Sequence, residues 1–261
     1  MCHPSGSRPP DLPAELLRPI SGGAAGEDAM LVSADGTRFR GYLARADDGD
    51  AGVVINPDVR GLHPFYEELA ERFASAGVNA IAFDYFGRSA GTDRRADAFE
   101  YMPHVRETRP QTVYADIAAT RAHLERQTGA RRIFVLGFCF GGRLAFLQSA
   151  ELSGVAGVIG FYGRLGKREN ETWPTPAEEA KRMRAPVLGL FGGDDPSIPP
   201  ADVAAFDRAL SETNVRHHLE TYPGAPHSFF DRTFREHQAA CEDAWRRALG
   251  FIRTGDPSKA A

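Results

Sequence analysis

Cys139 has the setting in this chain that most clearly suggests chemistry. It lies in the sequence G-F-C-F-G-G at residues 137–142, after a strand-like apolar run and before a helix-like run. This spacing has the form of a nucleophile elbow, in which the reactive side chain occupies a strained strand-to-helix turn. Gly137 and Gly141 would relieve crowding across the turn, and Gly142 would let the helix approach the sheet. A free cysteine is more often a core residue, but a core cysteine needs no such glycines. We therefore predict a nucleophilic thiol, which the helix N-terminus would stabilise as a thiolate.

A thiol nucleophile needs a base, and the base needs a partner that fixes its tautomer. Asp195 follows one strand-like run in a G-G-D-D-P turn, and His227 follows the next such run in G-A-P-H-S-F. An acid in such a turn is often only a turn cap, and Asp194 is an alternative. The order nucleophile, acid, histidine is that of α/β-hydrolases. We predict that Cys139, Asp195 and His227 form a catalytic triad.

The remaining histidines and cysteines do not indicate a metal site. His217 and His218 are adjacent in a predicted strand, so they point to opposite faces. The pair Cys2-His3 at the terminus is weak evidence for metal binding. Cys241 lies on the apolar stripe of the last predicted helix and is expected in the core. We predict no metal and no cofactor.

Strand-like and helix-like runs alternate along most of the chain, which predicts a mostly parallel sheet flanked by helices. An antiparallel hairpin should open the domain, with a type I′ turn at Asp35-Gly36. Residues 84 to about 110 read as a long loop that could frame a pocket. Ligands of such sheets bind at the carboxyl ends of the strands, where the triad residues fall. The expected strands are residues 29–33, 38–45, 51–56, 78–83, the run before Cys139, 155–163, 186–191 and 217–222, and the expected helices include residues 64–77, 112–127, 200–211 and 234–252.

Composition limits the class of protein. The 261 residues suit one α/β domain at residues 28–254, with an N-terminal arm at 1–27 and a flexible tail at 255–261. A net charge of -4, from 31 basic and 35 acidic residues, offers no basic excess for nucleic acid. No signal peptide and no apolar run of about 18 residues is found, so no membrane partner is expected. Three scattered cysteines suit a reducing cytoplasm. Oligomeric state is left open.

The chain resembles the dienelactone hydrolase family of α/β-hydrolase-fold enzymes from about Val53 to the final helix. The resemblance is carried by the three motifs around Cys139, Asp195 and His227. It implies a Cys-His-Asp triad that opens lactones or related esters through an acyl-thioester, without a metal or organic cofactor.

The resemblance also implies an oxyanion hole and a contact to the resting thiol. Backbone N–H groups of Val59 and Phe140 would hold the oxyanion. At Asp58 the family commonly has a glutamate that contacts the thiol. The aspartate is one methylene shorter, so it could reach Cys139 or instead hold a neighbouring arginine.

Substrate-binding residues are the third implication. Arg88 matches an arginine of the family's D-x-Y-x-R segment that helps bind an anionic substrate group, or it is a surface arginine. Phe86 replaces the tyrosine of that segment, and Arg232 is shifted by one place from a second family arginine. Independently of the resemblance, Tyr162 is expected to help shape the substrate pocket.

The leading hypothesis is a cysteine-dependent hydrolase of a small lactone or carboxylic ester. One alternative is a family member that catalyses another step on an activated carbonyl, namely C–C cleavage, isomerisation or cyclisation. The other is a ligand-binding protein that has kept the elbow without catalysis.

Overall fold

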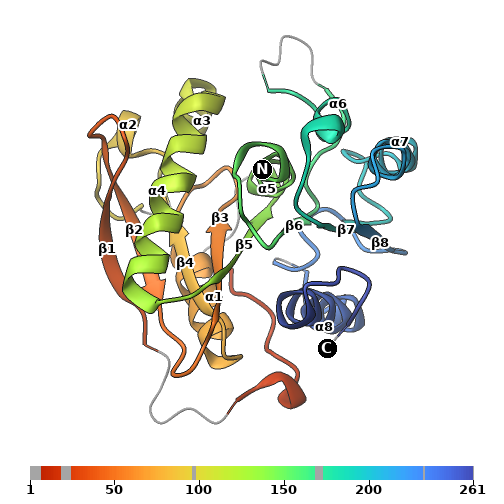
Figure 1. Cartoon of the computed structure of the whole chain (residues 1–261), viewed down its shortest axis with the longest axis horizontal. Coiled ribbons are helices and arrows are strands. Elements are labelled where there is room, and N and C mark those ends of the chain that lie inside the picture. The colour runs from red at the N-terminus through yellow and green to blue at the C-terminus, as the bar shows by residue number, and fades with distance from the viewer. Residues whose placement is uncertain (1–6, 19–24, 96–97, 168–172, 232, 261) are drawn as a thin grey trace. The chain divides into compact units, whose positions relative to one another are not determined.

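The computed structural model describes residues 7–18, 25–95, 98–167, 173–231 and 233–260. The chain forms two compact units, Met1–Ile133 and Phe134–Ala261, called here the N-terminal and C-terminal units (Figure 1). Arg232 and the pair Cys2-His3 lie outside the described residues.

The N-terminal unit places four strands in the order β1-β2-β4-β3. The pairs β1–β2 and β2–β4 are antiparallel, and β3–β4 is parallel. Gly77 ends the helix before β4 with a φ of 82°, as expected for a glycine stop signal. The elements are η1 (Ala14–Leu16), β1 (Glu27–Val32), β2 (Arg38–Ala44), β3 (Ala51–Asn56), α1 (Pro64–Ser75), β4 (Asn79–Phe83), α2 (Gly87–Ala90), α3 (Tyr101–Glu107) and α4 (Pro110–Thr128).

Two details of this unit differ from the sequence prediction. The hairpin does not have a type I′ turn, because that turn needs a positive φ at both central residues and only Gly36 has one, at 84°. Instead Gly36 N–H donates to the Ser33 carbonyl at 2.9 Å, and Ser33 N–H to the Thr37 carbonyl at 2.8 Å. The expected loop from residue 84 to 110 is also not one irregular segment, because it contains α2 and α3.

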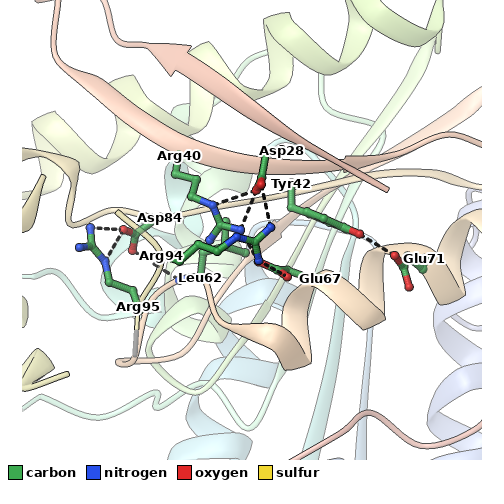
Figure 2. A network of polar contacts seen from close by, with 9 residues as sticks. All are labelled: Asp28, Arg40, Tyr42, Leu62, Glu67, Glu71, Asp84, Arg94 and Arg95. Carbon is green, nitrogen blue, oxygen red and sulfur yellow. Dashed lines mark hydrogen bonds and ion pairs between the residues drawn. The ribbon is translucent and has the colours of Figure 1, made fainter. Parts of the chain in front are cut away.

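A buried arginine ties the hairpin to α1 (Figure 2). Arg40 of β2 donates to Asp28 of β1 at 2.7 Å and also forms an ion pair with Glu67 of α1. Arg94 contacts the same two carboxylates, at 2.7 Å and 2.9 Å. With its side chain only 6% exposed, Arg40 needs these charges, because an unpaired buried guanidinium would be strongly destabilising.

The C-terminal unit has its strands in the order β5-β6-β7-β8, all parallel. Helices α5 and α8 lie on either side of β6 and β7 (Figure 1). A Cβ at Gly157 would lie 2.2 Å from Phe251 of α8, and one at Gly160 would lie 2.3 Å from Phe146 of α5. The elements are β5 (Arg132–Phe138), most of which lies in this unit, α5 (Phe140–Glu151), β6 (Gly157–Phe161), α6 (Pro176–Glu179), η2 (Ala180–Arg182), β7 (Val187–Gly192), α7 (Pro200–Glu212), β8 (His217–Tyr222) and α8 (Gln238–Thr254).

The predicted fold class is confirmed: an α/β protein with mostly parallel strands, helices between them and an antiparallel hairpin near the N-terminus. The last helix starts at Gln238 rather than at Phe234, because turns occupy the preceding residues, with Asp231 N–H donating to the Ser228 carbonyl at 3.0 Å. No helix among the described residues has the length and apolar character needed to cross a membrane.

Candidate active site

Cys139 occupies a strained turn between β5 and α5. Its φ of 55° and ψ of -113° are outside the regions that non-glycine residues usually adopt. A Cβ at Gly137 would lie 2.0 Å from the Gly141 carbonyl oxygen, and one at Gly142 would lie 2.6 Å from the Phe161 carbonyl oxygen. The steric reasons predicted for Gly137 and Gly142 are therefore present. The cysteine is half-buried.

Asp195 and His227 are brought together by the loops that follow β7 and β8. His227 Nδ1 is 2.5 Å from Asp195 Oδ2, and the aspartate side chain is fully buried while the imidazole is 29% exposed. The loops can approach closely because a Cβ at Gly192 would lie 2.4 Å from the Ala225 carbonyl oxygen. Asp194, the alternative acid, is exposed, and its N–H donates to that same carbonyl at 3.0 Å. The geometry thus favours Asp195 as the partner of His227.

Ser197 holds the other oxygen of the Asp195 carboxylate and was not anticipated from the sequence. Its hydroxyl donates to Oδ1 at 2.6 Å, and its N–H donates to the same atom at 2.9 Å. These bonds and the His227 contact fix both carboxylate oxygens. The D-x-S spacing is a signal that could have predicted this, because an aspartate often accepts from the backbone N–H two residues later.

Tyr162 lies beside the histidine, directly after β6. Its ring is 5.0 Å from that of His227 and 5.9 Å from that of Phe138, centroid to centroid. The residue is buried and has a φ of 37°. Its N–H donates to the Leu190 carbonyl at 2.8 Å. The structure therefore places Tyr162 against the imidazole, and its contact with substrate stays a prediction.

The electrostatics of the site favour a charged imidazole. Burial opposes the imidazolium, but hydrogen bonds to Asp195 and Cys139, together with their negative charges, raise the pKa of His227 to about 10. Burial would likewise raise the pKa of Asp195, but hydrogen bonds from His227 and Ser197 lower it. Because the Nδ1 atom faces Asp195, the Nε2 atom is the one available to Cys139.

A pH titration of His227 follows from this shift. Its pKa of about 10 in the folded chain lies above the ordinary 6.5, so the charged pair stabilises the fold fully below pH 6.5. That contribution is lost as the pH rises through about 10. We expect NMR of the chain with ¹⁵N-labelled histidine to show a protonated His227 at neutral pH. A midpoint near 6.5 for this residue would contradict the assignment.

Asp58 holds a neighbouring arginine, which is one of the two alternatives left open by the sequence. In the N-terminal unit, Arg60 donates to its carboxylate through Nη2 at 2.6 Å and through Nε at 3.1 Å. Burial would raise the pKa of Asp58, but His63 and Arg60 hold it well below its ordinary value. Val59 lies in the same turn, between β3 and α1.

Arg88 is held by two carboxylates of the N-terminal unit. Its Nη2 atom is 2.6 Å from Asp116, whose side chain is 2% exposed, and its Nη1 atom pairs with Asp35. Thr37 and Ser33 accept further hydrogen bonds from it, at 2.7 Å and 3.1 Å. Through these contacts Arg88 holds the hairpin loop to α4. Its binding of an anionic substrate group stays a prediction.

The structure also places the remaining residues that the sequence analysis singled out. Phe140 is the first residue of α5, and its ring meets Trp173 edge to face with centroids 5.7 Å apart. Cys241 is in the core as predicted; its thiol donates to the Phe229 carbonyl at 3.4 Å, and burial raises its pKa to about 12. Within the described ranges, no group of three or more His, Cys, Asp or Glu residues could hold a metal ion.

The sequence is similar to one family of known proteins over most of its length. The pattern of the dienelactone hydrolase family matches residues 39–255. A Salmonella typhimurium protein named "Putative carboxymethylenebutenolidase" is 31% identical over 259 residues, which is 96% of each chain. An Escherichia coli K12 protein of the same name is 29% identical over 229 residues, covering 85% of this chain and 84% of its own.

A solved structure extends the similarity to the fold. The crystal structure described as a "Putative Dienelactone Hydrolase" from Klebsiella pneumoniae superposes with a TM-score of 0.78 at 28% identity. The match covers 88% of this chain and 99% of that one. The α/β-hydrolase fold predicted from the sequence is therefore confirmed.

Proposed function

The chain belongs to the dienelactone hydrolase family, and from this premise we propose that it is an ester or lactone hydrolase whose nucleophile is Cys139. The observation that carries the proposal is the 2.5 Å contact between Asp195 and His227, whose pKa is raised by both Asp195 and Cys139. A charged imidazole beside a thiolate is suited to acyl transfer.

In the proposed reaction the Cys139 thiolate attacks the substrate carbonyl carbon, and the carbonyl oxygen becomes an oxyanion. Backbone N–H groups of Val59 and Phe140 stabilise this charge. The intermediate collapses when the C–O bond to the leaving oxygen breaks, and His227 gives that oxygen its proton. The product of this half-reaction is a thioester on Cys139.

Water then completes the cycle. His227, now neutral, takes a proton from the attacking water, a second oxyanion forms, and the C–S bond breaks to release the carboxylic acid. Throughout, Asp195 accepts from Nδ1 and keeps Nε2 directed at the reacting atoms. The substrate class that fits is a small lactone or carboxylic ester. We also keep a cytoplasmic location and the lack of a nucleic-acid partner as predictions from the composition.

Single-turnover mass spectrometry in ¹⁸O-labelled water tests the proposal. With an aryl ester or enol lactone, we expect a transient acyl adduct on the Cys139 peptide and one ¹⁸O in the released carboxylate. An adduct without label in the product would indicate another activated-carbonyl step, such as C–C cleavage, isomerisation or cyclisation. If no substrate in a broad panel forms an adduct or turns over, the proposal is wrong, and a binding protein without catalysis is the better account.

A further inference from the structure

In the turn between β3 and α1, one peptide N–H has no acceptor among the residues that the structure describes. Pro57 has no N–H. Of the N–H groups of residues 58 to 62, all but that of Val59 donate hydrogen bonds within the chain. Among the described residues Val59 N–H meets no acceptor, and Val59 is partly exposed, so this donor is open to a ligand. The occupied donors are Asp58 N–H to Tyr66 Oη at 2.8 Å, Arg60 N–H to Asp58 Oδ1 at 2.8 Å, Gly61 N–H to the Asp58 carbonyl at 3.1 Å and Leu62 N–H to Asp84 Oδ1 at 3.4 Å.

The carbonyl end of the peptide group that carries the Val59 N–H is contacted by the buried side chain of Tyr85. Tyr85 Oη contacts the carbonyl oxygens of two consecutive residues, that of Pro57 and, at 2.8 Å, that of Asp58, and Gly61 N–H donates to the Asp58 carbonyl as well. The Asp58 carbonyl and the Val59 N–H belong to one planar peptide unit, so fixing the direction of the C=O fixes that of the N–H. Hydrogen bonds to this carbonyl also polarise the N–H, because linked hydrogen bonds strengthen one another.

Tyr85 has little freedom to move. It is 2% exposed, and its ring makes edge-to-face contacts with Phe83 at 5.4 Å and Phe86 at 5.3 Å between centroids. The neighbouring residue Asp84 ties down the far end of the turn, because its carboxylate accepts from Leu62 N–H while also pairing with Arg95 at 2.5 Å (Figure 2).

We propose that Tyr85 is a positioning residue that orients and polarises the Val59 N–H as the oxyanion donor. The inference rests on the proposed function, in which Val59 holds the oxyanion. Asp58 contributes in the same sense: its carboxylate bridges to the Arg60 N–H and guanidinium, so it braces the turn on both sides of Val59. The turn is thus built to present one N–H.

The Tyr85→Phe variant tests this, because it removes one hydroxyl and keeps the ring. We expect kcat to fall about tenfold or more, a part of the roughly 10²–10³-fold cost of losing an oxyanion donor outright, with KM nearly unchanged. Binding of a trifluoromethyl ketone, which forms a hemithioketal oxyanion with the thiol, should weaken by a similar factor. Alkylation of Cys139 by iodoacetamide should keep its wild-type rate, because no oxyanion forms in that reaction.

Tyr42→Phe is the matched control. Tyr42 is also a buried tyrosine of the N-terminal unit, and its hydroxyl donates at 2.5 Å to Glu71 on α1 rather than to the turn (Figure 2). This variant should keep wild-type kcat and inhibitor affinity. If Tyr85→Phe does not fold, Tyr66→Phe removes the acceptor of Asp58 N–H and should show the same pattern with a smaller change.

The outcomes separate the inference from the proposed function. If Tyr85→Phe and Tyr66→Phe both keep wild-type kcat and inhibitor affinity while Cys139→Ala is inactive, the inference is overturned and the function stands. A loss in Tyr85→Phe that extends equally to the iodoacetamide rate also overturns it, because the defect would then not be specific to the oxyanion. If Cys139→Ala itself keeps full activity, the proposed function has failed.

Discussion

Replacing Cys139 by alanine is expected to abolish turnover of lactones and aryl esters, with kcat reduced by about 10⁴-fold or more. In the proposed mechanism alanine has no atom that can form the thioester, and His227 loses the cysteine side chain that helps to raise its pKa. Alanine should be tolerated at the elbow because it adds no atom to the crowded turn. The comparison is made by steady-state assay on a panel of lactones and aryl esters, with circular dichroism to verify folding.

Cys241→Ala is the matched control for this experiment. Cys241 is the other cysteine among the described residues, and it is buried in α8 with its thiol donated to the Phe229 carbonyl. Its loss should leave kcat within about twofold and lower only the stability, by about 1 kcal/mol. A Cys139→Ala enzyme that still hydrolyses esters at the wild-type rate would remove this residue from the mechanism.

The sequence was sufficient to predict the elbow because its constraint is local and steric. Gly137 must approach the Gly141 carbonyl closely in any such turn, and only glycine allows this. The parallel strands were equally accessible, because buried strands of this type are short continuous apolar runs ended by turn residues. The turn at Asp35-Gly36 was mispredicted because the same dipeptide also suits a longer loop in which glycine alone has a positive φ.

The partners of charged residues could not be predicted, because they depend on contacts between distant parts of the chain. Arg88 meets Asp116, 28 positions later, and Asp35, 53 positions earlier. Tyr85 reaches the turn 27 positions before it. The family resemblance suggested an anion-binding role for Arg88, but it gave no information on the two carboxylates that occupy this guanidinium here. The partner of Asp58 was one of two alternatives, a neighbouring arginine or the distant Cys139, and the choice between them depends on how the chain folds.

Replacing Asp195 by asparagine should lower kcat by about 10³-fold or more while leaving the fold intact. The side chain is fully buried and nearly isosteric with asparagine, so packing is preserved, but the charge that supports the imidazolium is removed. An asparagine amide can also donate to Nδ1, which would turn the imidazole to the tautomer with its proton on Nε2 and prevent Nε2 from accepting a proton. The pKa of His227 should fall toward 6.5, because hydrogen bonding to Asp195 is a main cause of its rise.

The adjacent acid supplies the control. Asp194→Asn makes the same chemical change one residue away, on an exposed side chain. The backbone N–H of Asp194 donates to the Ala225 carbonyl, and this bond is kept in the variant. We expect this variant to keep kcat within about twofold and to leave the His227 titration near pH 10. Steady-state assays and NMR titrations of both variants measure the two effects independently. Equal losses in the two variants would mean that general surface charge supports the histidine, whereas a loss confined to Asp195→Asn requires the direct hydrogen bond between the buried carboxylate and Nδ1.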